Sequence, residues 1–391
     1  MIAVDDALAR LFALVRPTGT ETVQLLEADG RILARPVTAT RDQPPFPASA
    51  MDGYALQGAA VVPGARFTVI GESAAGHGFD GTVGAGEAVR IFTGAPLPEG
   101  ADRVVIQEDV TRDGETITLG DRLDTGDNIR PAANDFARGF TLDAPRRLTP
   151  NDIALLASMN RPEVTVARRP VVALISTGDE LVMPGDDISR DQIIASNTFG
   201  LHALLRRLGA APRLLPIARD TTGALSMAFD LARGADLVVT IGGASVGDHD
   251  LVARVAEARG MERSFYKVAM RPGKPLMAGR IDDAMMIGLP GNPVSAMVCG
   301  HVFLAPVVRA MLGQPAERAA TTPRPLAAPI PANGPREHYM RAVREGDAVR
   351  VFDRQDSALL SVLARADTLV VRPPNDPARA EGETVETLAL T

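Results

Sequence analysis

Two stretches of this chain pass from an apolar strand through a tight loop into a helix, and both lie between residues 236 and 295. The first joins the run DLVVT to I-G-G-A-S-V-G-D-H-D, and the second joins MMIGL to P-G-N-P-V-S. This order aims backbone N–H groups and a helix N-terminus at an anion. The region therefore predicts an anion cradle, built twice on one α/β framework.

Lysine use singles out the same region. Only two of the 41 basic residues are lysines, and both, Lys267 and Lys274, lie between the two loops. We expect an ammonium here to do what a guanidinium fork cannot, such as contacting a phosphate-like oxygen as a point charge. The alternative is a coincidence of composition.

Residues 168–313 alternate apolar β runs with amphipathic helices, a pattern typical of a doubly wound parallel sheet. Ligands bind such sheets outside the carboxyl ends of the strands. Polar residues follow each predicted strand there: Thr177, Asp179, Glu180, Asp220, Gly242, Gly243, Ser245, Asp248 and Asp250. Glycine loops with Lys suit a phosphate, and carboxylates beside it suit a divalent metal or activation of water. Neither a Walker A loop nor a dinucleotide fingerprint is present.

The rest of the chain predicts three further units around this α/β domain. Helical patterns stand on both sides of a β-rich insert, and a further β-rich stretch follows the α/β domain. Prolines at 44, 45 and 47 make the start of the insert rigid and extended, which suits either a connector or an ordered arm. The predicted class is thus multidomain α/β.

Composition excludes several functions. A net charge of −7 argues against a general nucleic-acid binder. The single cysteine, Cys299, excludes an internal disulfide and sits in an apolar run, so we expect a packed thiol. Acidic Asp5 and Asp6 do not suit a signal peptide, and the longest apolar stretch is interrupted by His301 and Pro306. We expect a soluble, cytoplasmic protein that is not held in a membrane.

Six motifs together identify a resemblance. They are P-x-S-A-M-D-G-Y-A at 47–55, T-G-A-P-L-P at 93–98, S-T-G-D-E-L at 176–181, G-G-x-S-V-G-x-x-D at 242–250, R-P-G-K-P at 271–275 and L-P-G-N-P-V-S at 289–295. In this order they resemble the molybdopterin molybdotransferase family, the molybdenum insertases related to the gephyrin E domain.

The resemblance implies four domains: a segmented N-terminal helical domain at 1–40 and 146–167, a β-rich insert at 41–145, a molybdopterin-binding α/β domain at 168–313 and a C-terminal β-barrel at 314–391. It also implies a homodimer whose subunits share the active site. It implies a reaction in which adenylylated molybdopterin receives molybdate, its pyrophosphate bond is hydrolysed with Mg²⁺, and AMP and molybdenum cofactor leave.

The resemblance also implies roles for individual residues. The catalytic set would be Asp52, Thr93, Asp135, Glu180, Asp220 and Asp250, with Mg²⁺ on Asp220 and Asp250. Substrate contacts would come from Gly242, Gly243, Ser245, Gly247, Lys267, Arg271, Lys274, Pro290, Gly291, Asn292, Pro293 and Ser295. Molybdate would meet Lys274, Arg336 and Ser357. The loop before Asp135 reads Ala133-Asn134, where the family usually has Gly-Glu.

Two other functions compete with the insertase. An adenylyltransferase acting on molybdopterin would share the α/β fold, but it needs neither the arm with Asp52 nor the other domains. A scaffold that lost the chemistry would not be expected to keep the carboxylates.

Overall fold

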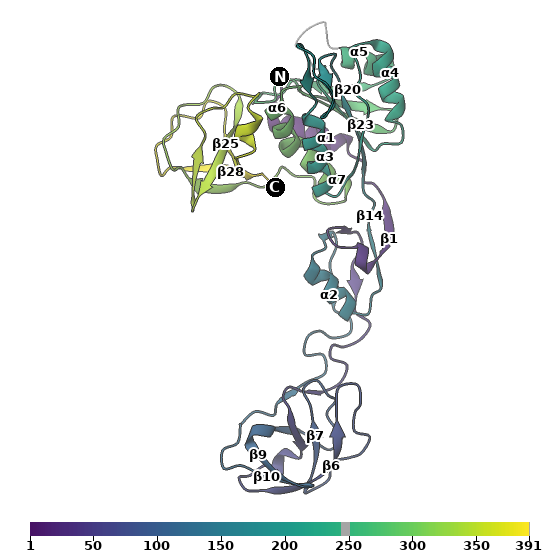
Figure 1. Cartoon of the computed structure of the whole chain (residues 1–391), viewed down its shortest axis with the longest axis vertical. Coiled ribbons are helices and arrows are strands. Elements are labelled where there is room, and N and C mark those ends of the chain that lie inside the picture. Colours follow the sequence, from purple (N-terminus) through teal and green to yellow (C-terminus); the bar gives the residue numbers. More distant parts are fainter. Residues whose placement is uncertain (244–250, 391) are drawn as a thin grey trace.

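The computed structural model describes residues 1–243 and 251–390 of the chain. The molecule is elongated (Figure 1), with the α/β unit and the C-terminal sheet side by side at one end and the β insert at the other. A narrow middle section, formed by chain from before and after the insert, joins the two ends. The insert is therefore far from the α/β unit of its own chain.

A six-stranded sheet organises the α/β unit, in the order β18-β15-β19-β23-β22-β20. The first four strands are parallel: β18 (Ala211–Leu214), β15 (Val171–Ser176), β19 (Leu237–Ile241) and β23 (Ala284–Leu289). A hairpin turning at Asp282 adds antiparallel β22 (Met277–Ile281), and β20 (Glu262–Tyr266) completes the edge. The predicted doubly wound sheet is confirmed, with an antiparallel extension.

Helices cover both faces of this sheet, which explains why its central strands are apolar at every position. Leu174 faces one core, with α1 (Val4–Leu14), α3 (Asn197–Arg207), α6 (Pro293–Cys299) and α7 (Ala305–Met311). The next residue, Ile175, faces the other, with α4 (Thr222–Leu231) and α5 (Leu251–Ala258). The apolar stripe of helix α1, the first helix of the predicted segmented domain, packs against the core of the α/β unit.

The most apolar helical segment, Pro293–Met311, is long enough to cross a membrane by length and composition. It joins α6, the π-helical turn Gly300–Leu304 and α7. Of its most apolar 18-residue stretch, 83% is buried inside the fold. It is thus a core helix of the α/β unit. Cys299 lies fully buried within it, which confirms the expected packed thiol, and burial raises the pKa of that thiol.

The middle section is a small sheet, in the order β1-β14-β2-β13, with strands from both sides of the insert. These strands are β1 (Thr20–Gln24), β2 (Ile32–Leu33), β13 (Arg146–Arg147) and β14 (Glu163–Ala167). Helix α2 (Pro150–Ser158) packs on it and begins at a capping box between Thr149 and Asp152. Short pairs of extended chain then lead to the insert: β3 (Val37–Thr38) with β12 (Thr141–Leu142), and β4 (Ala48–Ser49) with β11 (Ile129–Arg130).

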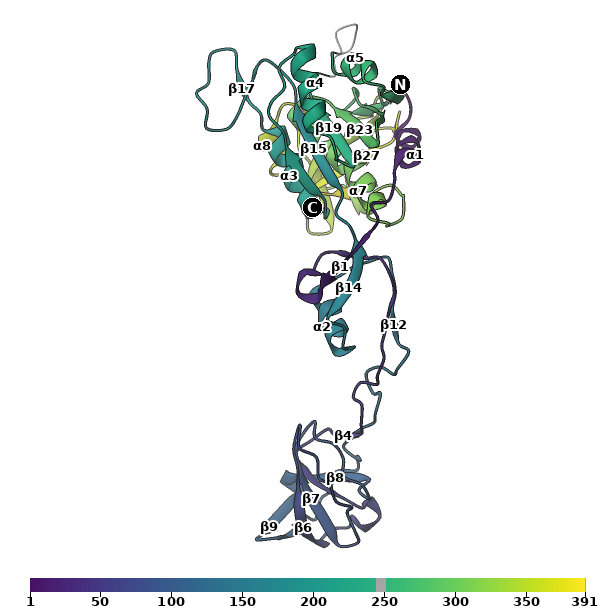
Figure 2. The ribbon, with the colours of Figure 1, turned by 90° about the vertical axis from the view of Figure 1, so that its right-hand side faces the viewer.

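The insert is a six-stranded sheet, in the order β8-β5-β7-β6-β10-β9 (Figure 2). Its strands are β5 (Gly53–Leu56), β6 (Arg66–Ser73), β7 (Glu87–Ile91), β8 (Arg103–Ile106), β9 (Val110–Asp113) and β10 (Thr116–Leu119). It encloses a core of its own around Leu56, Phe67 and Ile117. The all-β character predicted for this part is confirmed.

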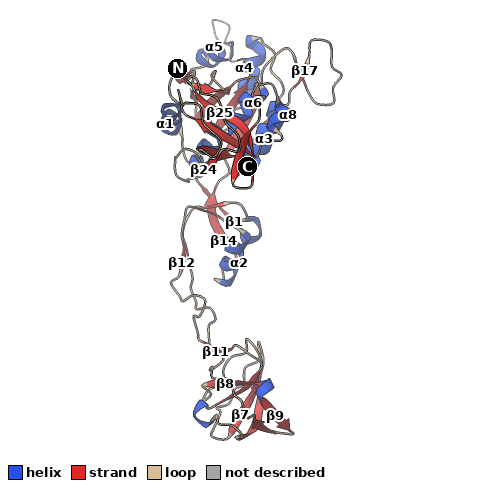
Figure 3. Cartoon of the chain, turned by 90° about the vertical axis from the view of Figure 1, so that its left-hand side faces the viewer, coloured by secondary structure: helices blue, strands red, loops and turns tan. Residues whose placement is uncertain are grey.

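The C-terminal sheet is completed by a strand of the α/β unit. Its order is β21-β25-β27-β28-β24, and β26 (Ala348–Val351) pairs with the last residues of β25, beyond β21. Strands β24 (Thr322–Pro325), β25 (Glu337–Glu345), β27 (Thr368–Arg372) and β28 (Thr384–Ala389) follow the α/β unit in the chain, whereas β21 (Met270–Arg271) ends on the first residue of the R-P-G-K-P motif. Figure 3 shows this sheet against the α/β unit, with helix α8 (Leu360–Leu363) beside α3. The pairing of Arg271 with His338 brings basic residues of both units together.

Candidate functional site

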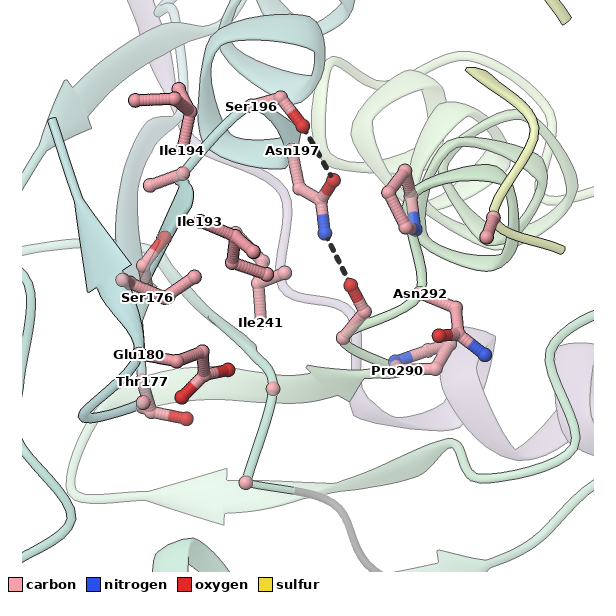
Figure 4. A pocket seen from close by; sticks show the side chains of 18 of the residues that line it. Ser176, Thr177, Glu180, Ile193, Ile194, Ser196, Asn197, Ile241, Pro290 and Asn292 are labelled. Carbon is pink, nitrogen blue, oxygen red and sulfur yellow. Dashed lines mark hydrogen bonds between the residues drawn. The ribbon is translucent and has the colours of Figure 1, made fainter. Parts of the chain in front are cut away.

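A cleft of about 610 Å³ opens at the carboxyl ends of the parallel strands (Figure 4). Its walls come from the ends of β15, β19 and β23, from the start of α3 and from the loop before α6. Ala358 of the C-terminal unit adds one edge. The cleft therefore lies where an open α/β sheet binds its ligands.

Glycines at the end of β19 let the chain turn into the cleft. Gly242 and Gly243 have φ values of 93° and 65°. A Cβ on Gly242 would lie 2.6 Å from the carbonyl oxygen of Thr177, and one on Gly243 would lie 2.4 Å from Val252 Cγ2. Both positions thus require glycine for conformation and for space. The predicted contacts Ser245 and Gly247 and the predicted acid Asp250 fall in 244–250, outside the described residues.

Two of the predicted acids, Glu180 and Asp220, line the same cleft. They come from loops that follow different strands, and Asp179 joins those loops by accepting a hydrogen bond of 3.1 Å from the Asp220 backbone N–H. Arg219 donates to the Asp179 carbonyl at 2.6 Å. Partial burial raises the pKa of Asp220, and the charges of Asp179 and Glu180 raise it further.

This acidic group suits a hard cation. Among the described residues, no three His, Cys, Asp or Glu side chains are arranged to hold a metal ion by themselves. Mg²⁺ does not need such a cage, because it commonly binds one or two carboxylates together with water and substrate phosphates. Burial raises the pKa of Asp220, and the neighbouring charges of Asp179 and Glu180 raise it further, so a bound cation would favour the ionised carboxylate. The residues present therefore fit Mg²⁺.

The opposite wall is the P-G-N-P loop before α6. Pro290, Gly291, Asn292 and Pro293 all line the cleft, as predicted substrate contacts would. Asn197 holds this wall, since its side-chain amide donates to the Gly291 carbonyl at 2.6 Å, and Ser196 donates to the Asn197 side chain at 3.3 Å (Figure 4). Sequence reasoning missed Asn197 and Ser196, although they stand at the start of a predicted helix where a polar side chain faces the strand ends.

A serine of the C-terminal unit reaches the same loop. The Asn292 side-chain amide donates to the hydroxyl of Ser357 at 3.1 Å, and the Val294 N–H donates to the Ser357 carbonyl at 3.0 Å. Ser295, one residue further, is buried. The structure thus brings Asn292 and Ser357, predicted for different ligands, into direct contact.

The predicted basic residues Lys267, Arg271, Lys274 and Arg336 are not among the residues that line the cleft. Lys274 is half-buried and precedes Pro275, which lines the cleft, while Arg271 is exposed on β21. Arg336 donates to the Met270 carbonyl at 3.4 Å, next to Arg271 in the chain. Lys267 has a φ of 73° and its ammonium lies 4.9 Å from the centre of the Tyr266 ring. Positive charge therefore gathers where the α/β unit meets the C-terminal sheet.

The remaining predicted catalytic residues are not at this cleft in the same chain. Asp52 accepts hydrogen bonds from the Thr93 backbone N–H at 2.7 Å and the Thr93 hydroxyl at 2.8 Å, and these bonds lower the Asp52 pKa. Both residues belong to the insert, at the far end of the molecule (Figures 1 and 2). Asp135 lies exposed in the connecting chain, where its N–H donates to Gln43.

Comparison with known proteins covers almost the whole chain. Models of the MoeA N-terminal region (domain I and II), a probable molybdopterin binding domain and the MoeA C-terminal region (domain IV) match residues 2–160, 173–310 and 323–390. The molybdopterin molybdenumtransferase of Haemophilus influenzae is 39% identical over 319 residues, 80% of this chain and 78% of that protein. The Bacillus subtilis enzyme of the same name is 31% identical over 404 residues, 100% of this chain and 94% of its own.

Solved structures show the same arrangement. The molybdopterin biosynthesis MoeA protein of Pyrococcus horikoshii, in two crystal structures, gives TM-scores of 0.86 and 0.84. The sequence identities are 29% and 26%, and each comparison covers 100% of this chain and at least 99% of the other.

Proposed function

Because this chain belongs to the MoeA family of molybdopterin molybdenumtransferases, we propose that it inserts molybdate into adenylylated molybdopterin. The protein is a transferase of molybdenum cofactor biosynthesis. The proposal adds the chemistry: hydrolysis of the pyrophosphate bond with Mg²⁺, and release of AMP and molybdenum cofactor. The reaction takes place in the cytoplasm and involves neither nucleic acid nor membrane.

One observation carries this proposal. In a single cleft, the carboxylates of Glu180 and Asp220 lie on loops across from the P-G-N-P wall, and the glycine pair at the end of β19 lies between them. Exposed backbone at glycines suits phosphate oxygens, and carboxylates suit the cation and the water that attack on a phosphoanhydride requires. A volume of about 610 Å³ is of the size that a nucleotide or pterin ligand needs.

The residues of the cleft then divide into those that would bind the substrate, those that would hold Mg²⁺ and one that would act on the water. Gly242, Gly243, Pro290, Gly291, Asn292 and Pro293 would hold the substrate, together with Ser295, Lys267 and Arg271 and with Ser245 and Gly247 outside the described residues. Asp220 and Asp250 would hold Mg²⁺, which when bound would neutralise charge on the pyrophosphate oxygens. Glu180 is left to orient the water or accept its proton.

Molybdate is a tetrahedral dianion, so it needs cationic and hydroxyl donors. Lys274 and Arg336 supply the charges and Ser357 supplies a hydroxyl, with Ser295 nearby. These residues come from the α/β unit and the C-terminal unit. We therefore propose that molybdate binds between these two units, beside the P-G-N-P wall of the cleft.

Asp52, Thr93 and Asp135 complete the site in a homodimer, in which the insert of one subunit reaches the cleft of the other. The separation of the insert from the cleft of its own chain supports this arrangement. Mixing two inactive variants tests it. Asp52→Asn and Lys274→Met homodimers should both lose nearly all activity, whereas a mixed dimer, with one intact composite site of two, should regain up to half of the wild-type activity per dimer. No recovery in proven heterodimers would refute the shared site.

The activity itself is tested with purified protein, adenylylated molybdopterin, molybdate and MgCl₂. We expect AMP and active cofactor to appear together, and AMP to disappear from the products when EDTA replaces MgCl₂. Failure to release AMP would refute the insertase. Formation of adenylylated molybdopterin from ATP would instead indicate the adenylyltransferase.

A further inference from the structure

Arg90 of the insert lies between two aromatic rings. Its guanidinium carbon is 5.0 Å from the centre of the Tyr54 ring and 4.8 Å from the centre of the Phe92 ring. One terminal nitrogen donates to the Gly53 carbonyl at 3.0 Å, and the other donates to the Gln107 side chain at 2.6 Å. The guanidinium therefore makes cation–π contacts with two rings and donates two hydrogen bonds.

These contacts hold the two segments that carry Asp52 and Thr93. Gly53 directly follows Asp52, and Phe92 directly precedes Thr93. Strands β5 and β7 pair Gly53 with Ile91 and Tyr54 with Arg90, so the two segments meet at this end of the strand pair. Gln107, the other partner of Arg90, donates its backbone N–H to the Asp52 carbonyl at 3.0 Å. Arg90 thus touches the chain beside both members of the pair.

The turn after Asp52 is tightly enclosed. A Cβ on Gly53 would lie 2.0 Å from the Val105 carbonyl oxygen, so the backbone there has little room to move. Asp52 itself is bound by both the N–H and the hydroxyl of Thr93. Among the described residues Arg90 forms no ion pair within 4.0 Å, so its direct contacts are with the rings and with neutral oxygens, while its charge also helps to lower the pKa of Asp52.

We propose that Arg90 is a positioning residue that locks Asp52 and Thr93 into one rigid unit for presentation to the active site. The inference rests on the proposed role of Asp52. A misplacement of about 1 Å can slow an enzyme roughly 100-fold. Loss of Arg90 should therefore lower kcat while the cleft, and with it substrate binding, stays intact.

Steady-state AMP release by the full-length dimer tests this with Arg90→Met, Arg90→Lys and the control Arg112→Met. Arg112 is exposed on β9, and its Nε contacts the Gly114 carbonyl. We expect kcat to fall about 10- to 100-fold in Arg90→Met, with KM for adenylylated molybdopterin changed less than twofold. Arg90→Lys should recover only part of kcat, because an ammonium cannot stack on two rings and bond two oxygens in one plane. Arg112→Met should behave as wild type.

A double-mutant cycle with Asp52→Asn separates positioning from general structure. Asp52→Asn should keep a small single-turnover rate. If Arg90 acts through Asp52, adding Arg90→Met to this variant should lower that remaining rate less than twofold. A full additional loss in the double variant, or a wild-type kcat in Arg90→Met, would overturn the proposal. Should thermal unfolding show that Arg90→Met does not fold, Arg90→Lys replaces it in the same cycle, and the same two results would overturn the proposal. Wild-type activity of Asp52→Asn would instead refute the proposed role of Asp52.

Discussion

Asn292 and Ser357 are hydrogen-bonded at 3.1 Å, although 65 residues separate them in the chain. The Ser357 carbonyl also accepts from the Val294 N–H, so the first turn of α6 and a loop of the C-terminal unit share two bonds. The C-terminal unit is thereby a structural part of the cleft wall. It is not a separate module that merely follows the α/β unit.

Ser357→Ala should weaken molybdate use more than substrate binding. The variant removes one hydroxyl from the proposed oxyanion site and leaves the Asn292 amide without its partner. A hydrogen bond to a charged group contributes about 1.5–3 kcal/mol, which corresponds to roughly a 10- to 100-fold higher KM for molybdate. AMP release measured against molybdate concentration checks this. Ser158→Ala, at the end of α2, should leave this KM unchanged, and an unchanged KM in Ser357→Ala would remove Ser357 from the site.

Lys274→Arg should be costly despite keeping the charge. A guanidinium is larger and planar, whereas the half-buried position beside Pro275 suits a compact ammonium. We expect kcat/KM for molybdate to drop at least about tenfold, a loss of about 1.4 kcal/mol of transition-state stabilisation. The reverse exchange, Arg271→Lys, is the matched control, because Arg271 is exposed and either cation can bind an anion there. Full activity of Lys274→Arg would show that a guanidinium suffices at this position.

Gly243→Ala should disturb the glycine turn at the end of β19, which is proposed to bind the substrate phosphates. At a φ of 65° the added Cβ would lie 2.4 Å from Val252 Cγ2 and 2.8 Å from Thr177 Oγ1, so the backbone or helix α5 must shift. We expect a loss of about 1–3 kcal/mol in unfolding free energy and a higher KM for adenylylated molybdopterin. Gly223→Ala, in α4 with no atom within 4 Å of its Cβ, should be neutral or stabilising by about 1 kcal/mol. Equal stability of the two variants would contradict the steric argument.

His338 should make the fold sensitive to acid. Burial first, and then the charges of Arg271, Arg341, Arg372 and Arg336, together lower the pKa of His338 to about 4. The folded state therefore resists protonation that the unfolded chain, with an ordinary pKa of about 6.5, accepts. This contribution to stability is complete above pH 6.5 and is lost as pH falls toward 4, by up to about 3 kcal/mol.

Urea unfolding between pH 7 and pH 4 measures this effect in wild type and His338→Gln. The variant should lose less stability over the interval, because its side chain does not titrate. Replacing the exposed His77 in the same way should leave the wild-type slope. A slope in His338→Gln as steep as that of wild type would assign the acid sensitivity to other groups.

Local patterns explain which parts of the α/β unit could be read in advance. The runs VVALI and LVVT are short, rich in β-branched residues and apolar at successive positions, which favours a strand covered on both faces. Gly242 and Gly243 stand where such a strand ends, so a tight loop was predictable. Helix α1 shows the limit, because its apolar stripe specifies a buried face but not which core receives it.

By itself the sequence determined the strand–loop–helix framework, the glycine loops and the acids that follow the strands, because these depend on periodicity and on backbone conformation over a few residues. Tertiary structure alone decided that Arg271 pairs with His338 in one sheet, that Asn197 supports the Gly291 carbonyl, and that Ser357 bonds Asn292. It also decided that Asp52 and Thr93 meet each other far from the cleft of their own chain. Contacts between distant segments depend on how whole units pack, and no local pattern encodes that choice.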